Sequence, residues 1–417
     1  MLDAVQRQTF RYFWEEAHPT SGLAFDRRTA GTRAADDPWK SPKGDSDPIT
    51  IGGSGFGAMA IIVATQRGWI TRDAALERLD RMLELLLRAR CYHGALPHFM
   101  NGSTGETIAF GRKDDAADLV ETSLLLMGLL CVREYFQRDT PQEAAVRSRI
   151  TTLWNDVEWT WFTRGADEVL YWHWSPYHGW AMDHQIRGWN ECLITYVLAA
   201  SSPRYAIDPG VYHRGFASGG GFSNRKSWYD IELPLGMSHG GPLFFAHYSF
   251  CALDPRGLSD AYADYWAQNV HHVQINRAHC VANPGKFVGY GESCWGLTAS
   301  DNPWGYSAHA PDNDNGTISP TAALASMPYA PAEAMTVLRH LLQRHGKRVW
   351  RELGFVDAFC ESEGWYADTF LAIDQGPIIV MIENHRTGLL WQLFMAVPEI
   401  QAGLRRLGFS SPHLKGQ

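Results

Sequence analysis

The chain has 417 residues, a net charge of −8 and 45% hydrophobic residues, which is typical of a globular protein with a large core. Without a cluster of Lys and Arg, it has no basic patch of the kind that binds nucleic-acid backbones, so we expect no nucleic-acid partner. No apolar run approaches the roughly 20 residues that span a bilayer, so we expect no membrane contact.

The cysteine pattern and the first residues bear on cofactors and compartment. The seven cysteines are odd in number and scattered, without a C-x-x-C pair, so neither a zinc site nor a disulfide framework is indicated. We expect no metal and no organic cofactor. The start Met-Leu-Asp-Ala-Val lacks the basic and apolar regions of a signal peptide. As written, the chain is expected to be a cytoplasmic monomer, or periplasmic if a leader has been removed.

Helical segments of two kinds alternate along the chain. Charged, amphipathic segments predict outer helices, and segments that are apolar all round predict buried ones. The predicted outer helices are 2–17, 72–90, 142–159, 208–217, 259–278 and 332–353. The predicted inner helices are 54–66, 118–135, 190–200, 242–253, 319–327 and 377–395, and a short helix over 398–407 closes the chain.

Six inner and six outer helices in strict alternation are what two concentric rings require. We therefore predict an all-α fold, an (α/α)6 barrel, formed by a single domain over 1–417. Connections from an inner to the next outer helix are short, whereas those from outer to inner are long, including a Gly/Pro/Asp-rich loop before residue 54. The long loops must gather at the N-termini of the inner helices, and loops of this length are usually functional.

One apolar helix carries acids in its opening turns. The stretch Gly111–Phe136 is predicted to be helical, with Asp114, Asp118 and Glu121 on one stripe because they are spaced i, i+4 and i+7. Charged side chains are seldom buried unless they are paired. These acids are either N-terminal caps with salt bridges to Arg112 or Lys113, or the floor of a catalytic pocket.

A fourth carboxyl, Glu191, is predicted in the first turn of the third inner helix. It follows a run rich in Trp and His, from Trp172 to Trp189. Burial among aromatic rings would raise its pKa, as the general acid of a glycosidase requires, while an ionised partner at a helix N-terminus suits the base. The alternative is a glutamate that caps its own helix.

Aromatic and acidic residues in the long loops are candidates for substrate contacts. The chain has 17 Trp, and aromatic rings stack on the flat faces of ligands such as sugars. Trp180 and Trp189 are equally expected to be core residues. The acids could instead stabilise the loops through hydrogen bonds or ion pairs. The candidates are Trp180, His184, Trp189, Trp295, Asp301, Trp304, Tyr306 and Asp374.

Two motif matches have weak support. Gly53-Ser-Gly55-Phe-Gly57-Ala58 is similar to a dinucleotide fingerprint, but no strand–helix–strand unit surrounds it, and small residues also let helices pack closely. Asp312-Asn-Asp314-Asn-Gly316 is similar to the start of a calcium loop, but Ala323 stands where the bidentate Glu is required. A looser calcium site or a simple turn are the remaining interpretations.

Several stretches resemble the bacterial glycoamylase-like family that includes β-1,2-glucanases (glycoside hydrolase family 144) and a domain of cyclic β-1,2-glucan synthases. The resemblance extends over nearly the whole chain. It rests on Phe10-Arg-Tyr-Phe-Trp14, Ser54-Gly-Phe-Gly57, Gly188-Trp-Asn-Glu191, Trp295-Gly-Leu-Thr-Ala-Ser-Asp301, Asp314-Asn-Gly-Thr-Ile-Ser-Pro320, Ile373-Asp-Gln-Gly-Pro377 and Met381-Ile-Glu-Asn384.

The resemblance implies an (α/α)6 barrel without cofactor that hydrolyses a β-linked glucan, with β-1,2-glucan as the expected substrate. In it, Asp114, Asp118, Glu121 and Glu191 would line the pocket, with Glu191 as general acid. From the residues themselves we expect the base to be Asp114, Asp118 or Glu121, and we expect the reaction to invert the anomer. A transglycosylase and a non-catalytic glucan-binding barrel are the alternatives. Departures from the family pattern at 95–99 and 117–122 leave linkage, chain length and endo or exo action open.

Overall fold

The computed structural model describes residues 1–31 and 48–414, and much of the Gly/Pro/Asp-rich loop lies outside them. The apolar segments form buried helices, and in two of them, α6 and α8, every residue is buried. A helix that is hydrophobic on all sides is stable only inside a core. These inner helices are α2 (Ile51–Gln66), α4 (Leu119–Tyr135), α6 (Leu193–Ser201), α8 (Pro320–Leu324) and α10 (Ala372–Thr387).

The charged segments form helices that bury one face. In α3, for example, Leu79, Met82, Leu83 and Leu86 recur at helical spacing and are buried, while the charged residues face outward. Thr71, Thr140 and Asp264 cap α3, α5 and α7 by accepting hydrogen bonds from the first turn. The outer helices are α1 (Leu2–Trp14), α3 (Arg72–Arg88), α5 (Pro141–Asp156), α7 (Tyr265–Ala282) and α9 (Pro331–His340).

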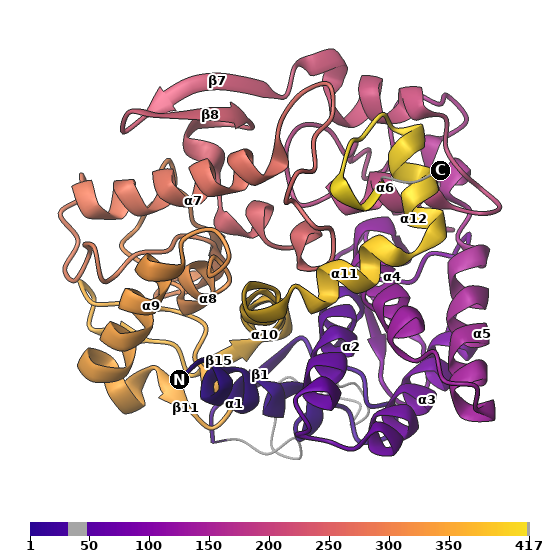
Figure 1. The fold of residues 1–417 in the computed structure, drawn as a ribbon, viewed down its shortest axis with the longest axis horizontal. Helices are drawn as coiled ribbons and strands as arrows, with labels where there is room; N and C mark the ends of the chain where they lie inside the picture. Colours follow the sequence, from indigo (N-terminus) through magenta and orange to yellow (C-terminus); the bar gives the residue numbers. More distant parts are fainter. Residues whose placement is uncertain (32–47, 415–417) are drawn as a thin grey trace.

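The inner helices pack on one another in chain order. α2 contacts α4 and α10, α4 contacts α6, and α10 contacts α8, with α1, α3, α5, α7 and α9 placed around them (Figure 1). The C-terminal helices α11 (Leu389–Ala396) and α12 (Pro398–Arg406) pack on α4 and α6. The result is a helix-rich fold. None of the described helices combines the length and the apolar character needed to cross a bilayer.

Glycine allows the closest helix contact, between α2 and α4. A Cβ on Gly55 would lie 2.2 Å from the carbonyl oxygen of Leu124, and one on Gly128 would lie 2.1 Å from the carbonyl oxygen of Gly55. Both distances are too short for a side chain, because backbone atoms cannot move aside as a flexible side chain can. The glycines of the 53–58 motif therefore serve helix packing, the second interpretation of that motif.

Gly55→Ala is expected to destabilise the protein by about 1–3 kcal/mol, the usual cost of overpacking a core. The methyl group would push α2 away from α4, on which the acids of the site depend. Urea denaturation measures the change, with Gly111→Ala as control because a Cβ there meets nothing within 4 Å. Equal stability of the two variants would show that the helices separate at little cost.

Several predicted helices have different bounds or a different form. Segment 242–253 is not α-helical but forms two 3₁₀ turns, Leu243–Ala246 and Ser249–Cys251, since its crowded aromatic residues are poor helix formers. Segment 208–217 forms one π-helical turn, Val211–Phe216. Segment 377–395 divides at Gly388, which is in the left-handed conformation with φ 72°, and Pro377 lies inside α10 rather than at its start.

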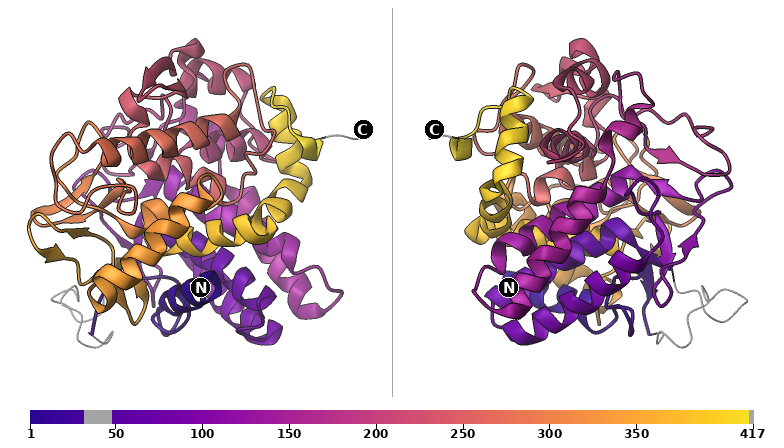
Figure 2. Two further views of the ribbon diagram at one scale, coloured as in Figure 1. Left: turned by 60° about the vertical axis from the view of Figure 1, so that its left-hand side comes forward. Right: turned by 90° about the vertical axis from the view of Figure 1, so that its right-hand side faces the viewer.

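The all-α prediction is wrong for the loops, because short strands tie them together in seven small sheets among the described residues. In the right-hand view of Figure 2, loops with short strands lie on the side opposite α11 and α12. The strands are β1 (Arg27–Thr29), β2 (Pro48–Thr50), β3 (Phe99–Asn101), β4 (Thr107–Ile108), β5 (Ala117–Asp118), β6 (His173–Trp174), β7 (Ser223–Trp228), β8 (Ile231–Leu235), β9 (Ala299–Asn302), β10 (Gly305–Ala308), β11 (Trp350–Arg351), β12 (Gly354–Phe355), β13 (Phe359–Cys360), β14 (Trp365–Tyr366) and β15 (Thr369–Leu371).

Candidate active site

The helix that carries the predicted acids begins later than the sequence suggests. α4 starts at Leu119, and Asp118 is its N-cap with extended backbone (φ −121°, ψ 106°) because it pairs with His173 in the β5–β6 sheet. Asp114 lies in the preceding turn, where its backbone bonds to that of Gly111. The prediction of one helical stripe is therefore wrong, although the acids still gather, since the β5–β6 pairing folds the turn back over the helix N-terminus.

Asp118 is fully buried and every part of its carboxylate has a partner. Oδ1 accepts hydrogen bonds from the amides of Val120 (3.0 Å) and Glu121 (2.9 Å) and from the indole of Trp172 (2.8 Å). Burial by itself would raise the pKa of Asp118, but the hydrogen bond and charge of His98 outweigh it and lower the pKa below its ordinary value. The capping interpretation is thus confirmed for Asp118, with histidines rather than Arg112 or Lys113 as partners.

Two histidines join the acids. His98 Nδ1 lies 3.1 Å from Asp118 Oδ2, and His173 Nε2 lies 3.3 Å from Asp114 Oδ2 and 3.7 Å from Asp118 Oδ2. Burial would lower the pKa of His98, but the charges of Glu121, Asp118 and Asp114 raise it to about 10. His98 is therefore a cation at neutral pH, and it compensates the negative charge of the buried acids.

Glu121 lies in the first turn of α4 and reaches the start of α2. Its Oε2 accepts a hydrogen bond of 2.7 Å from the Gly52 amide and one of 3.4 Å from the Thr50 hydroxyl. Burial raises the pKa of Glu121, against the opposing charge of His98. A Cβ on Gly52 would lie 2.7 Å from Oε2, so only glycine leaves room for this contact.

Glu191 lies in the turn just before α6, not in its first helical turn. Burial, with the charges of Glu121 and Asp118 in the same direction and a hydrogen bond from its own backbone against it, raises the pKa of its carboxyl to about 7. Among the described residues no other side chain bonds to this carboxyl, and the residue is partly exposed. The capping alternative for Glu191 stays a prediction, because the carboxyl accepts from its own backbone amide, whereas the N-cap residue of α6 is Cys192. Glu191 is thus a protonatable group with accessible surface next to ionised acids.

A hollow of about 590 Å³ opens over the first acids. Such a volume is within the range of small-molecule sites. His184, a predicted substrate contact, lies on its wall and stacks on Trp172 with ring centroids 4.8 Å apart. The lining residues are His98, Phe110, Gly111, Arg112, Lys113, Asp114, Asp118, Trp172, His173, Met182 and His184.

A second acidic group contains the predicted contacts Asp301 and Asp374. Arg27 Nη1 donates to both oxygens of Asp301, at 3.2 and 3.0 Å. Burial and the charge of Asp301 raise the pKa of Asp357 to about 7, and burial with the charge of Asp357 raises the pKa of Asp374 well above its ordinary value. These shifts favour a protonated carboxyl in the Asp357–Asp374 pair at neutral pH, because two buried like charges raise each other's pKa.

Tyr248 connects the two groups. It is 7% exposed, and burial raises its pKa together with the charges of Asp374 on one side and of Glu191 and Glu121 on the other. Glu121 accepts from the Gly52 amide, and a Cβ on the next residue, Gly53, would lie 2.6 Å from the Cβ of Ala372 in the first turn of α10, which also carries Asp374. The two acidic groups therefore meet where α2, α4 and α10 begin.

The predicted aromatic contacts occupy three different environments. Trp189 (4% exposed) and Trp295 (0%) lie in the hydrophobic core, so these indoles offer a ligand no surface, and their prediction as contacts is corrected. Trp180 lines a separate hollow with Trp161 and Tyr205. Trp304 (66% exposed) and Tyr306 (47%) lie on the β9–β10 hairpin, in which Tyr306 pairs with Asp301, and their rings are accessible.

The sequence does not single out Asp26, Asp357 or Tyr248 as site residues. Asp26 precedes β1, whose pairing with β15 brings it to the start of α10, and burial raises its pKa. No sequence pattern marks Asp357, which lies in the loop between β12 and β13. Only the fold brings its carboxylate to the Asp301 amide, from which it accepts a hydrogen bond of 2.7 Å. The one sequence feature that could have indicated this acidic group is the adjacent pair of opposite charges, Asp26 and Arg27.

Two groups of acidic residues are candidates for metal sites. Ligand atoms of His98, Asp114 and Asp118 lie within 4.8 Å of one another, but these atoms already pair with one another in the contacts given above. In the 312–316 motif, Asp314 accepts a hydrogen bond from Tyr290 (2.8 Å) and contacts His279 Nε2 (2.8 Å). Its carboxylate thus serves to tie a loop to α7, which favours the simple turn.

A family model and individual relatives match this chain. Residues 183–398 match the model of the glycoamylase family, described as "putative glucoamylase". An exo β-1,2-glucooligosaccharide sophorohydrolase of Parabacteroides distasonis is 44% identical over 98% of this chain, which spans 57% of the length of that relative.

Solved structures are similar over nearly the whole chain. An endo-β-1,2-glucanase of Chitinophaga pinensis, in complex with sophorotriose and glucose, is 48% identical with a TM-score of 0.95, and the match covers 99% of this chain and 98% of that one. A β-1,2-glucanase of Parabacteroides distasonis is 43% identical with a TM-score of 0.91, covering 98% of this chain and 59% of that one.

Proposed function

Because this chain belongs to the glycoamylase family, we propose that it is a glycoside hydrolase that cleaves β-1,2-linked glucan. The observation that carries the proposal is Glu191, a partly exposed carboxyl with a pKa of about 7 beside carboxylates at a helix N-terminus. A pair of carboxyl groups with separated pKa values is what acid and base catalysis of glycoside cleavage requires. The relatives that act on β-1,2-glucans support this choice of linkage.

In this proposal Glu191 protonates the leaving oxygen as general acid. Asp114 or Glu121 activates water as general base, since each keeps 7% of its surface exposed. Asp118 is fully buried, and its hydrogen bonds fix α4 and the two histidines, so we assign it a positioning role. With water between acid and base, the anomeric configuration inverts. Proton NMR of the first product identifies its anomer, and a β-anomer would refute inversion.

We also propose that the helices form one (α/α)6-barrel domain over 1–417. The two 3₁₀ turns within 243–251 would occupy the place of the fourth inner helix. The site then lies at the end where the inner helices begin, with Trp304, Tyr306 and Asp301 on its rim and Asp374 within it. Aromatic faces on the rim suit a chain of sugar rings.

Incubation with β-1,2-, β-1,3- and β-1,4-glucans, followed by a reducing-end assay, tests the function. We expect release only from the β-1,2-glucan, and no release from any of them would refute the proposal. Chromatography of the products over time separates the possible actions. Mixed long products at early times indicate endo cleavage, a single disaccharide indicates exo cleavage, and products longer than the substrate indicate transglycosylation.

The pH dependence follows from Glu191. A general acid must be protonated, so kcat/KM is expected to fall as pH rises through about 7, the pKa of this carboxyl. Glu191→Gln should lack this basic limb in its residual activity, because glutamine does not titrate. A limb that persists in the variant would assign the titration to another group.

A further inference from the structure

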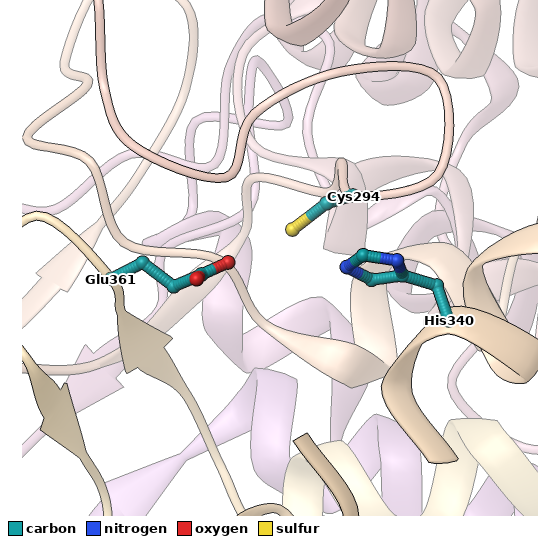
Figure 3. Close-up of side chains that lie close together, drawn as sticks. All are labelled: Cys294, His340 and Glu361. Carbon is teal, nitrogen blue, oxygen red and sulfur yellow. The ribbon is translucent and has the colours of Figure 1, made fainter. Parts of the chain in front are cut away.

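A cysteine, two histidines and a glutamate come together away from the acids of the proposed active site. Cys294 lies in the loop between α7 and β9, His340 is the last residue of α9, and Glu361 follows β13. One ligand atom of each of these three lies within 4.8 Å of the others. Figure 3 shows their side chains pointing toward one another from three separate segments.

Two histidines at this place have buried ring nitrogens without a hydrogen-bond partner among the described residues. They are Nε2 of His340 and Nε2 of His345. His345 is 3% exposed, and its Nε2 lies 3.5 Å from Glu361 Oε1. Buried polar atoms are nearly always paired, so each unpaired nitrogen requires an explanation. A metal ion bound to Nε2 of His340 would satisfy that nitrogen, while Nε2 of His345 faces the Glu361 carboxylate.

The remaining contacts agree with ligand roles. Nδ1 of His345 is 3.2 Å from the Tyr366 hydroxyl, a contact that orients the imidazole beside Glu361. The competing cation, Arg344, is 65% exposed and 3.9 Å from Glu361, which makes it a weak partner.

We propose that Cys294, His340 and Glu361 bind a zinc ion. Thiolate, imidazole and carboxylate are zinc ligands in tetrahedral sites, whereas calcium and magnesium prefer oxygen alone. The π-helical turn Leu341–His345 brings His345 beside Glu361, where its Nε2 orients the carboxylate from outside the ligand group. This site departs from the expectation of no metal, since the sequence separates Cys294 from its partners.

The zinc would act on stability. It would join the loop before β9, the end of α9 and the loop after β13, and Trp295, next to Cys294, is fully buried in the core. Three protein ligands leave the fourth position of the tetrahedron to a water molecule, and because the ligands come from three separate segments, we assign the ion a role in holding these segments together. Zinc binding at this place is independent of glucan cleavage, because none of the acids of the proposed active site is a ligand.

The test begins with the whole protein stripped by a chelator, reconstituted with zinc and freed of excess by gel filtration. We expect about one zinc per chain by mass spectrometry, and a melting temperature that falls again on chelation. Titration with Co²⁺ should give a thiolate-to-cobalt charge-transfer band. Cys294→Ser should lose the zinc and the band, while Cys91→Ser, at an exposed cysteine elsewhere, should keep both.

If Cys294→Ser does not fold, His340→Gln gives the answer, because it should lose the zinc while Cys91→Ser keeps it. Wild-type protein without zinc or without the cobalt band overturns the proposal. So does zinc content in Cys294→Ser or His340→Gln that is equal to that of Cys91→Ser.

Discussion

Glu191→Gln is expected to lower the turnover of β-1,2-glucan by a factor of about 10² or more, the scale of general acid catalysis. Glutamine has nearly the same shape but cannot give up a proton to the leaving oxygen. No other described side chain bonds to the Glu191 carboxyl, so the substitution leaves no buried partner unpaired and folding should be unchanged. Glucan binding should also persist. Initial rates, calorimetric binding and a melting curve measure the three properties.

The control is Glu232→Gln, which makes the same chemical change at an exposed position on β8. It should leave rate, binding and melting temperature as in the wild type. A Glu191→Gln variant with near-normal turnover and a lowered melting temperature would make Glu191 a structural residue, and the general acid would then have to be another carboxyl.

Asp118→Ala is expected to cost about 3–5 kcal/mol of unfolding free energy, because it removes the fully buried member of the ion pair and takes from the partly exposed His98 cation its hydrogen-bonded partner. It also removes the cap of α4 and the acceptor of the Trp172 indole. Activity should fall as well, since α4 carries Glu121 and the His98 ring loses its position. Urea denaturation and reducing-end assays measure both effects.

Asp264→Ala provides a matched comparison, because Asp264 is also an N-cap aspartate but is exposed and accepts only from the Ala267 amide. It should cost about 0.5–2 kcal/mol, the value of a cap alone. Asp118→Asn should fall between, since an amide oxygen can still cap the helix but carries no charge. Equal losses for Asp118→Ala and Asp264→Ala would show that the ion pair contributes nothing.

Two groups of side chains could not be predicted from patterns of neighbouring residues: the proposed zinc ligands and the second acidic group. Cys294, His340 and Glu361 are far apart in sequence and carry no joint motif, and Asp26 and Asp357 come from two loops while Asp374 lies in the first turn of α10. Strand pairing and helix packing bring each set together. A pattern of neighbouring residues cannot predict such contacts, because they depend on the path of the whole chain.

What the sequence determined by itself is the alternation of buried and amphipathic helices, because hydrophobic periodicity reflects burial directly. α3 begins at the predicted residue, and α2, α4 and α5 begin within three residues of prediction. The long loops rich in Trp, His, Gly and Asp likewise predicted a site at the N-termini of the inner helices, and Glu191 precedes one of these helices, α6. Only the tertiary structure decided that Asp118 is an N-cap, that Trp189 and Trp295 are core residues, and that 242–253 is not an α-helix. At Asp118 a contact distant in sequence outweighs the local preference, because the β5–β6 pairing holds this residue extended and α4 therefore begins one residue after it.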